Sequence, residues 1–153
     1  MNKRGQFYLV AAIIISTLVI GLTTVLNYYK ENKTPNLEET GEQLKIESRY
    51  VLDYAAINGV SASVVLKNFV DDFSYSLPEE TQMYVVIGDK GAINAYKYYN
   101  NGTYSTISYV ENANDVSIDI EGQLHTFNLY SGTHFYFVLY KNINNETFIT
   151  TNK

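Results

Sequence analysis

The chain contains no cysteine and only two histidines. Without cysteine it can form neither a disulfide framework nor a thiolate metal site. The histidines, His125 and His134, lie on expected strands among leucine, phenylalanine and tyrosine residues. Two imidazoles without a clear third ligand make a poor metal site, so the sequence predicts neither a metal nor another cofactor.

The residue spacings of catalytic and phosphate-binding sites are missing too. Residues 88–91, Gly-Asp-Lys-Gly, are typical of a turn and lack the longer spacing with which a glycine-rich loop holds phosphate. Asp71 and Asp72 are adjacent on an expected helix, where neighbours point to different sides, and a solvated helix face is the favoured interpretation. No nucleophile, base and orienting group stand at a recognisable spacing, so we expect the protein not to be an enzyme.

Positive charge is also in short supply. Eleven lysines and arginines stand against sixteen aspartates and glutamates, which gives a formal net charge of −5 at pH 7. An acidic exterior argues against nucleic acid and anionic lipid as partners. We therefore expect no nucleic-acid-binding function.

What the chain does have is a long uncharged run near its N-terminus. Lys3 and Arg4 precede Gly5, and the next charge is Lys30, so residues 6–29 form an uncharged segment of 24 residues. As an α-helix this segment would be about 36 Å long, enough to cross the hydrocarbon core of a bilayer. The basic pair favours a single span with a cytoplasmic N-terminus and an extracytoplasmic head.

The order of a basic pair, a glycine, a glutamine and a long apolar helix resembles the class III signal peptide of archaeal type IV pilin-like proteins. The resemblance implies cleavage between Gly5 and Gln6 by the class III signal peptidase, with Lys3 and Arg4 completing the processing site. Many family members carry a glutamate at the fifth mature position, where this chain has Val10. The alternative is a plain N-terminal anchor whose basic pair only satisfies the positive-inside rule.

The expected organisation has four parts. Residues 1–5 are a basic leader that the resemblance implies is cleaved, and residues 6–30 form a transmembrane or filament-core helix. Residues 31–36 are a linker, because Pro35 ends or kinks a preceding helix. Residues 37–153 form an extracytoplasmic head domain.

The resemblance also implies how the protein assembles. The helix first lies in membrane lipid and then packs against copies of itself or other pilin-like subunits in an extracellular filament. Small residues allow close helix packing, and the candidates are Ala11, Ala12, Ser16 and Gly21. The expected function is therefore a major or minor structural subunit of an archaeal type IV pilus-like surface filament.

The head sequence predicts two helices followed by strands. Residues 37–57 form an amphipathic helix whose apolar side comprises Leu44, Ile46, Tyr50, Val51, Tyr54, Ala55 and Ile57. A second helix follows Ser61, its expected N-cap. The strands are expected at 83–87, 92–99, 103–110, 116–120, 123–130, 134–140 and 148–151. The predicted fold class is α+β: an N-terminal membrane or filament helix, then two helices packed on an antiparallel sheet, in a pilin-like outline.

Tyrosine is abundant, with 15 residues in the chain. Five of them flank an Asn-Gly hairpin signal and form a candidate binding face: Tyr96, Tyr98, Tyr99, Tyr104 and Tyr109. This face supports an alternative function, a single-span membrane-anchored ectodomain that binds a sugar polymer or an envelope partner. Cross-strand tyrosine pairs that only stabilise the sheet explain the same pattern.

Three glycosylation sequons also lie beyond the apolar segment. Their acceptors are Asn32, Asn101 and Asn145. Modification at any of them would require an extracytoplasmic location.

Overall fold

The computed structural model describes residues 15–16, 37–143 and 146–152. The chain divides into two units, Met1–Pro35 and Asn36–Lys153, and we describe each by itself. In the first unit, Ile15 and Ser16 are helical and their side chains are exposed. The second unit, called the head below, contains every other described residue.

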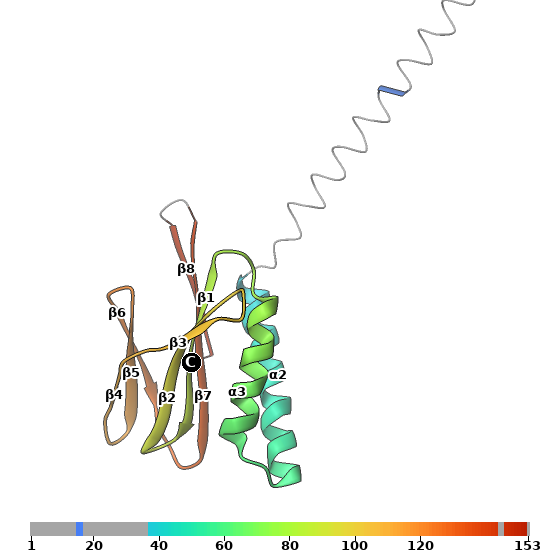
Figure 1. Cartoon of the computed structure of the whole chain (residues 1–153). Coiled ribbons are helices and arrows are strands. Elements are labelled where there is room, and N and C mark those ends of the chain that lie inside the picture. Colours follow the sequence, from blue (N-terminus) through green and yellow to red (C-terminus); the bar gives the residue numbers. More distant parts are fainter. Residues whose placement is uncertain (1–14, 17–36, 144–145, 153) are drawn as a thin grey trace, which may run out of the picture. The chain divides into compact units, whose positions relative to one another are not determined.

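Two helices form one layer of the head (Figure 1). Helix α2 (Leu37–Asn58) carries Glu38 and Glu39 in its first turn, where the helix dipole favours acids. It ends before Gly59, whose φ of +63° suits the left-handed residue that follows many helices. Helix α3 (Ala62–Phe73) starts after Ser61, as the sequence predicts, and continues into a short 3₁₀ turn, η1 (Ser74–Ser76).

Eight strands follow in the described part of the head, and every pair of neighbours is antiparallel. The five-stranded sheet has the order β3-β2-β1-β7-β8 and the three-stranded sheet has the order β4-β5-β6. Their bounds are β1 (Thr81–Asp89), β2 (Ala92–Tyr99), β3 (Tyr104–Thr106), β4 (Tyr109–Glu111), β5 (Asp115–Ile120), β6 (Gln123–Asn128), β7 (Thr133–Ile143) and β8 (Glu146–Thr151).

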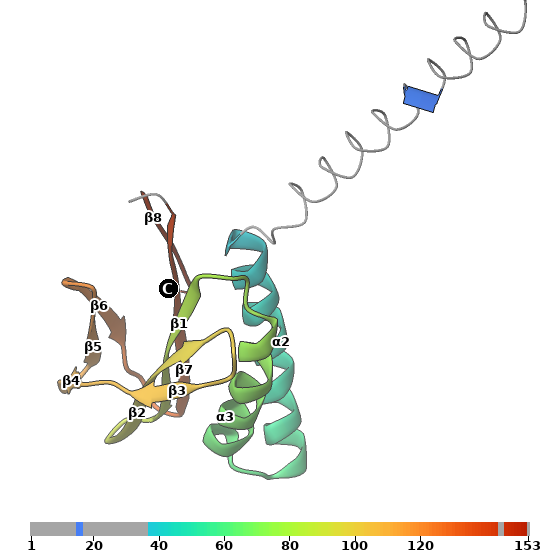
Figure 2. The ribbon, with the colours of Figure 1, turned by 45° about the horizontal axis from the view of Figure 1, so that its top comes forward.

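The central strand β1 is buried on both faces. Met83, Val85 and Ile87 point into a core shared with the helices, whereas Tyr84 and Val86 point into a second core shared with the three-stranded sheet. The continuous apolar run at 83–87 is therefore the central strand that the sequence predicts. The head thus has three layers, with the five-stranded sheet in the middle (Figure 2).

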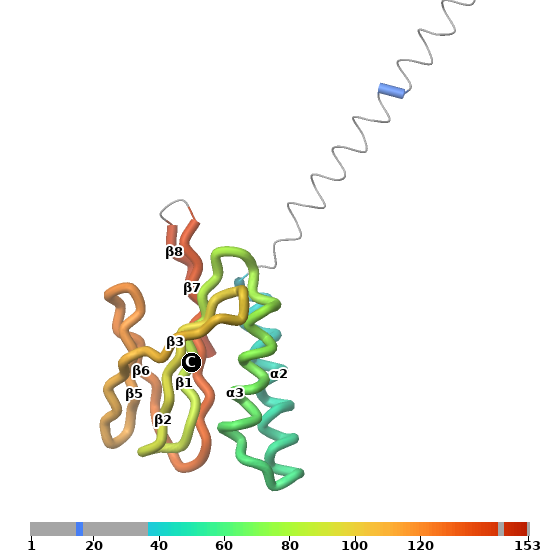
Figure 3. Tube along the Cα trace, viewed as in Figure 1, coloured from blue at the N-terminus to red at the C-terminus, as the bar shows by residue number. Residues whose placement is uncertain are grey.

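The fold class predicted from the sequence is wrong as stated, because the strands form two sheets and not one. The predicted strand at 103–110 breaks into β3 and β4 at Ile107 and Ser108, where the chain leaves the first sheet (Figure 3). The physical reason is the second face of the five-stranded sheet. Helices on one face alone would leave Tyr84, Val86 and Val138 in water, and the three-stranded sheet covers them.

The other part of that fold class is the predicted membrane or filament helix. Within the described residues, no helix combines the length and the apolar character that a membrane crossing needs. Most of residues 6–30 lie outside the described ranges.

The predicted apolar side of the first helix is right for Leu44, Val51 and Ala55 and wrong for its other four members. In α2 the buried side chains include Leu44 and Ala55. Four members of the predicted side are exposed instead, namely Ile46, Tyr50, Tyr54 and Ile57. Three further buried positions of α2 are the small residues Thr40, Gly41 and Ser48. At one of them the helix lies close to the sheet, because a methyl group at Gly41 would overlap Cγ2 of Thr150 on β8.

Candidate functional site

Three of the five candidate tyrosines meet beside helix α3. Tyr96 and Tyr98 are two residues apart on β2 and share a face, and Tyr104 on β3 lies opposite Tyr98. The ring centroids of Tyr98 and Tyr104 are 5.3 Å apart, and that of Tyr96 is 6.1 Å from Tyr98 and 5.7 Å from Tyr104. We call these three residues the tyrosine cluster.

An ion pair from α3 joins the tyrosine cluster. The Nζ of Lys67 lies 3.0 and 2.9 Å from the two carboxylate oxygens of Asp71, one helical turn further along. The same Nζ lies 4.2 Å from the ring centroid of Tyr104 and 5.4 Å from that of Tyr96, within the range of cation–π attraction. The hydroxyl of Tyr98 donates a 2.7 Å hydrogen bond to Oδ1 of Asp71.

The network changes the proton affinity of two of its members. Burial alone would lower the pKa of Lys67, but the hydrogen bonds and charge of Asp71 outweigh it and the pKa is raised. Burial, followed by the hydrogen bond to Asp71 and its charge, raises the pKa of the Tyr98 hydroxyl. Both groups therefore stay protonated at neutral pH, and the ion pair is locally neutral.

A pocket of about 210 Å³ opens next to this cluster, between α3 and strands β1 and β2. Its lining supplies a hydroxyl, two carboxamides, an aromatic ring and the paired ammonium, above one buried isoleucine. These residues are Ser63, Val64, Lys67, Asn68, Ile87, Asn94 and Tyr96. The walls offer hydrogen bonds in several directions without a net charge.

The other two candidate tyrosines lie elsewhere. Tyr99 points to the opposite face of β2, where the Nζ of Lys97 lies 5.5 Å from its ring centroid. Tyr109 belongs to β4, and its hydroxyl donates a 2.7 Å hydrogen bond to the carbonyl of Ile93. The five tyrosines therefore do not share one face.

The glycosylation candidate Asn101 lies at the exposed tip of the turn between β2 and β3. Its Oδ1 accepts hydrogen bonds from both the amide and the hydroxyl of Thr103, at 3.0 and 2.6 Å. Gly102 between them has a φ of +77° and packs against the ring of Tyr75.

Most candidates from the N-terminal segment cannot be placed. Ser16 is helical and exposed. The other packing, processing and glycosylation candidates lie outside the described residues: Lys3, Arg4, Gly5, Gln6, Ala11, Ala12, Gly21, Asn32 and Asn145.

Sequence reasoning missed the two charged members of the site. It assigned Asp71 to a solvated helix face, but the carboxylate is half-buried and binds both Lys67 and Tyr98. The available signal was the opposite charge four residues earlier, next to the core residues Leu66 and Val70.

The histidines do not come together. His134 lies on β7, where its Nε2 is 3.0 Å from the backbone of Tyr130, and His125 lies on β6 in the other sheet. Among the described residues, no group of three histidine, aspartate or glutamate side chains is placed to hold a metal ion.

Comparison with known proteins gives no match to any protein-family model, curated protein or solved structure.

Proposed function

We propose that the chain is a structural subunit, major or minor, of an archaeal type IV pilus-like surface filament. The observation that carries this proposal is the junction at Lys3-Arg4-Gly5-Gln6, which is followed directly by an uncharged segment of 24 residues. A membrane peptidase that cuts after Gly5 frees Gln6 and leaves the apolar segment on the mature protein. That segment stays in the lipid until it packs against copies of itself.

The assembly step exchanges lipid contacts for contacts between apolar segments. Such packing depends on close approach, which small residues allow at Ala11, Ala12, Ser16 and Gly21. The head then forms the outer surface of the filament, with the exposed Asn101 available for glycosylation.

The test is mass spectrometry of the N-terminal peptide from membranes and from sheared extracellular material. We expect a terminus at Gln6 that is enriched in the sheared fraction. Gly5→Val should leave the protein unprocessed in the membrane, whereas the control Asn2→Val carries the same new side chain three residues upstream and should be processed normally. An intact leader on assembled filaments, or normal filaments from Gly5→Val, would refute the proposal.

A second candidate function follows from the pocket beside Tyr96. A membrane-anchored ectodomain that binds a neutral sugar polymer would use the Tyr96 ring for the apolar face of a sugar and the carboxamides of Asn68 and Asn94 for its hydroxyls. The pairing of Lys67 with Asp71 removes the net charge that would favour an acidic sugar.

Because the chain has no tryptophan, its fluorescence comes from its 15 tyrosines, one of which, Tyr96, lines the pocket. Glucose and N-acetylglucosamine oligomers are the probes, titrated into the full-length protein. We expect a saturable change that Asn94→Ala abolishes and that Asn142→Ala, an exposed strand asparagine on β7, leaves unchanged. A change that survives Asn94→Ala, or no change with either probe, would exclude this candidate.

A further inference from the structure

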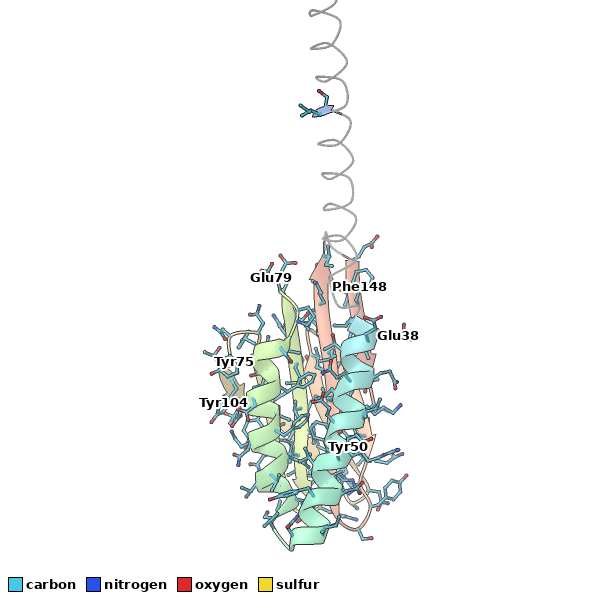
Figure 4. The ribbon with its side chains drawn as sticks, turned by 90° about the vertical axis from the view of Figure 1, so that its right-hand side faces the viewer. Glu38, Tyr50, Tyr75, Glu79, Tyr104 and Phe148 are labelled. Atoms are coloured by element: carbon cyan, nitrogen blue, oxygen red, sulfur yellow. The ribbon has the colours of Figure 1, made fainter. Side chains whose placement is uncertain are left out.

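The outer side of α2 carries four large apolar side chains that nothing within the described head covers. The exposed fractions are 53% for Ile46, 69% for Tyr50, 56% for Tyr54 and 84% for Ile57. Their spacing of four, four and three residues places them in one stripe along the helix. We call this set the outer stripe. Figure 4 faces the outer side of the helix layer, with Tyr50 labelled on α2.

The outer stripe is separate from the side of α2 that builds the core. Leu44, Ser48 and Ala55 are buried, and they lie on the other side of the helix. Helix α2 is therefore apolar on two opposite sides. A helix of this kind is buried between two partners, and the described head supplies only one of them.

The order of residues in the outer stripe is nearly the same in both directions. Isoleucine stands at each end and tyrosine at the two inner positions. If a second α2 packs in the opposite direction about an axis near residues 51 and 52, Ile46 lies opposite Ile57 and Tyr50 lies opposite Tyr54. A surface that matches its own copy in this way is typical of a two-fold, isologous interface.

Charges beside the outer stripe select the same arrangement. Arg49 and Asp53 are both exposed and lie along one edge of the stripe, one helical turn apart. In the antiparallel register, Arg49 of one copy lies close to Asp53 of the other, and the two-fold axis repeats the pair. In a parallel two-fold pairing, the edge that carries Arg49 and Asp53 faces the opposite edge of the other helix, so Arg49 and Asp53 would not meet.

We propose that the outer stripe of α2 is a self-association surface, and that its partner is the α2 helix of a second copy packed antiparallel to it. The pairing itself does not depend on the proposed filament. Its consequence rests on the proposed filament. Subunits of one filament all point the same way, so an antiparallel contact between heads joins two filaments side by side.

The experiment uses the absence of cysteine from the native chain. Single-cysteine variants of the full-length protein are prepared with two different tags, mixed in pairs and treated with a short bismaleimide. Ile46→Cys should cross-link to Ile57→Cys, and neither should cross-link efficiently to itself. Tyr75→Cys is the control, because Tyr75 is 69% exposed, the same fraction as Tyr50, and lies off α2.

Three outcomes would overturn the proposal. Preferential cross-linking of Ile46→Cys to itself would indicate a parallel contact. Equal cross-linking of Tyr75→Cys would indicate random collision, and the absence of any product would indicate that the heads do not pair. Processing at Gly5 is measured separately, so a failure here leaves the filament proposal standing.

Charge reversal supplies a second readout. Arg49→Asp should weaken the cross-link between positions 46 and 57 roughly tenfold, because the symmetry repeats each lost pair. The double variant Arg49→Asp with Asp53→Arg should restore it. A double variant that pairs as weakly as the single one would contradict the antiparallel register.

Discussion

The hydroxyl of Tyr98 donates a 2.7 Å hydrogen bond to the Asp71 carboxylate, and the Tyr98 side chain is fully buried. This bond ties strand β2 to helix α3 across the core of the head. It also holds Asp71 in position to pair with Lys67, and so it supports one wall of the pocket.

Removal of this hydroxyl should destabilise the head. We expect Tyr98→Phe to lower the free energy of unfolding by about 1–2 kcal/mol, because it deletes a hydrogen bond to a charged acceptor while keeping the ring. Thermal unfolding followed by circular dichroism measures the change. Tyr75→Phe, at an exposed position, is the control and should have little effect. Equal effects of the two substitutions would show that the buried bond contributes nothing.

Alkaline pH should weaken the same network. The pKa of Tyr98 is raised above its ordinary value of 10.0, and that of Lys67 above 10.5, so the folded head holds both protons more tightly than the unfolded chain. Their contribution to stability is complete below about pH 10 and is lost as the pH rises further. Melting temperatures between pH 8 and pH 11.5 should fall less steeply for Tyr98→Phe than for the native chain. Parallel curves would contradict this assignment.

Gly41 should be irreplaceable for a steric reason. Alanine normally favours a helix over glycine by about 1 kcal/mol. Here Gly41→Ala should instead destabilise the head by about 1–2 kcal/mol, because the new methyl group overlaps Cγ2 of Thr150 on β8. Thr150→Ser removes only that Cγ2 methyl group, so the double variant should recover the loss. Additive effects of the two substitutions in a double-mutant cycle would exclude the contact.

Asn152 should hold the end of β8 on β7. Its Oδ1 accepts from the amide of Phe137 and its Nδ2 donates to the carbonyl of Phe135, both at 2.9 Å. Asn152→Ala leaves these two backbone groups without that partner, so the amide of Phe137 should exchange its hydrogen roughly tenfold faster or more. Hydrogen-exchange mass spectrometry of β7 measures this. Asn142→Ala is the control, and an unchanged rate in Asn152→Ala would contradict the role.

Local signals in the sequence predicted much of the head. The first helix, expected at 37–57, is Leu37–Asn58, and the Asn-Gly pair at 101–102 makes the turn between β2 and β3. Glycine after an exposed asparagine makes such a turn favourable whatever surrounds it. The continuous apolar run in β1 likewise indicates burial on both faces.

Tertiary contacts decided the rest. Helix α2 has apolar residues on both sides, so periodicity alone could not tell that Leu44 faces the sheet and Tyr50 faces outward. The break between β3 and β4 depends on the apolar second face of the five-stranded sheet, which no local pattern reveals. Asp71 belongs to the site only because Tyr98 reaches it from a strand 27 residues later.

The two pairings of β1 set an order in which the head can form. On one side β1 pairs with β2, the next strand in the chain, through a short hairpin that closes quickly. On the other side β1 pairs with β7, and this pairing can form only after the chain has reached β7, because Asp89 pairs with Thr133. Until β7 arrives, β1 is an unpaired apolar edge that can bind the same edge of another molecule. During synthesis or export, the interval between residues 89 and 133 is therefore the period when this protein most needs protection from aggregation.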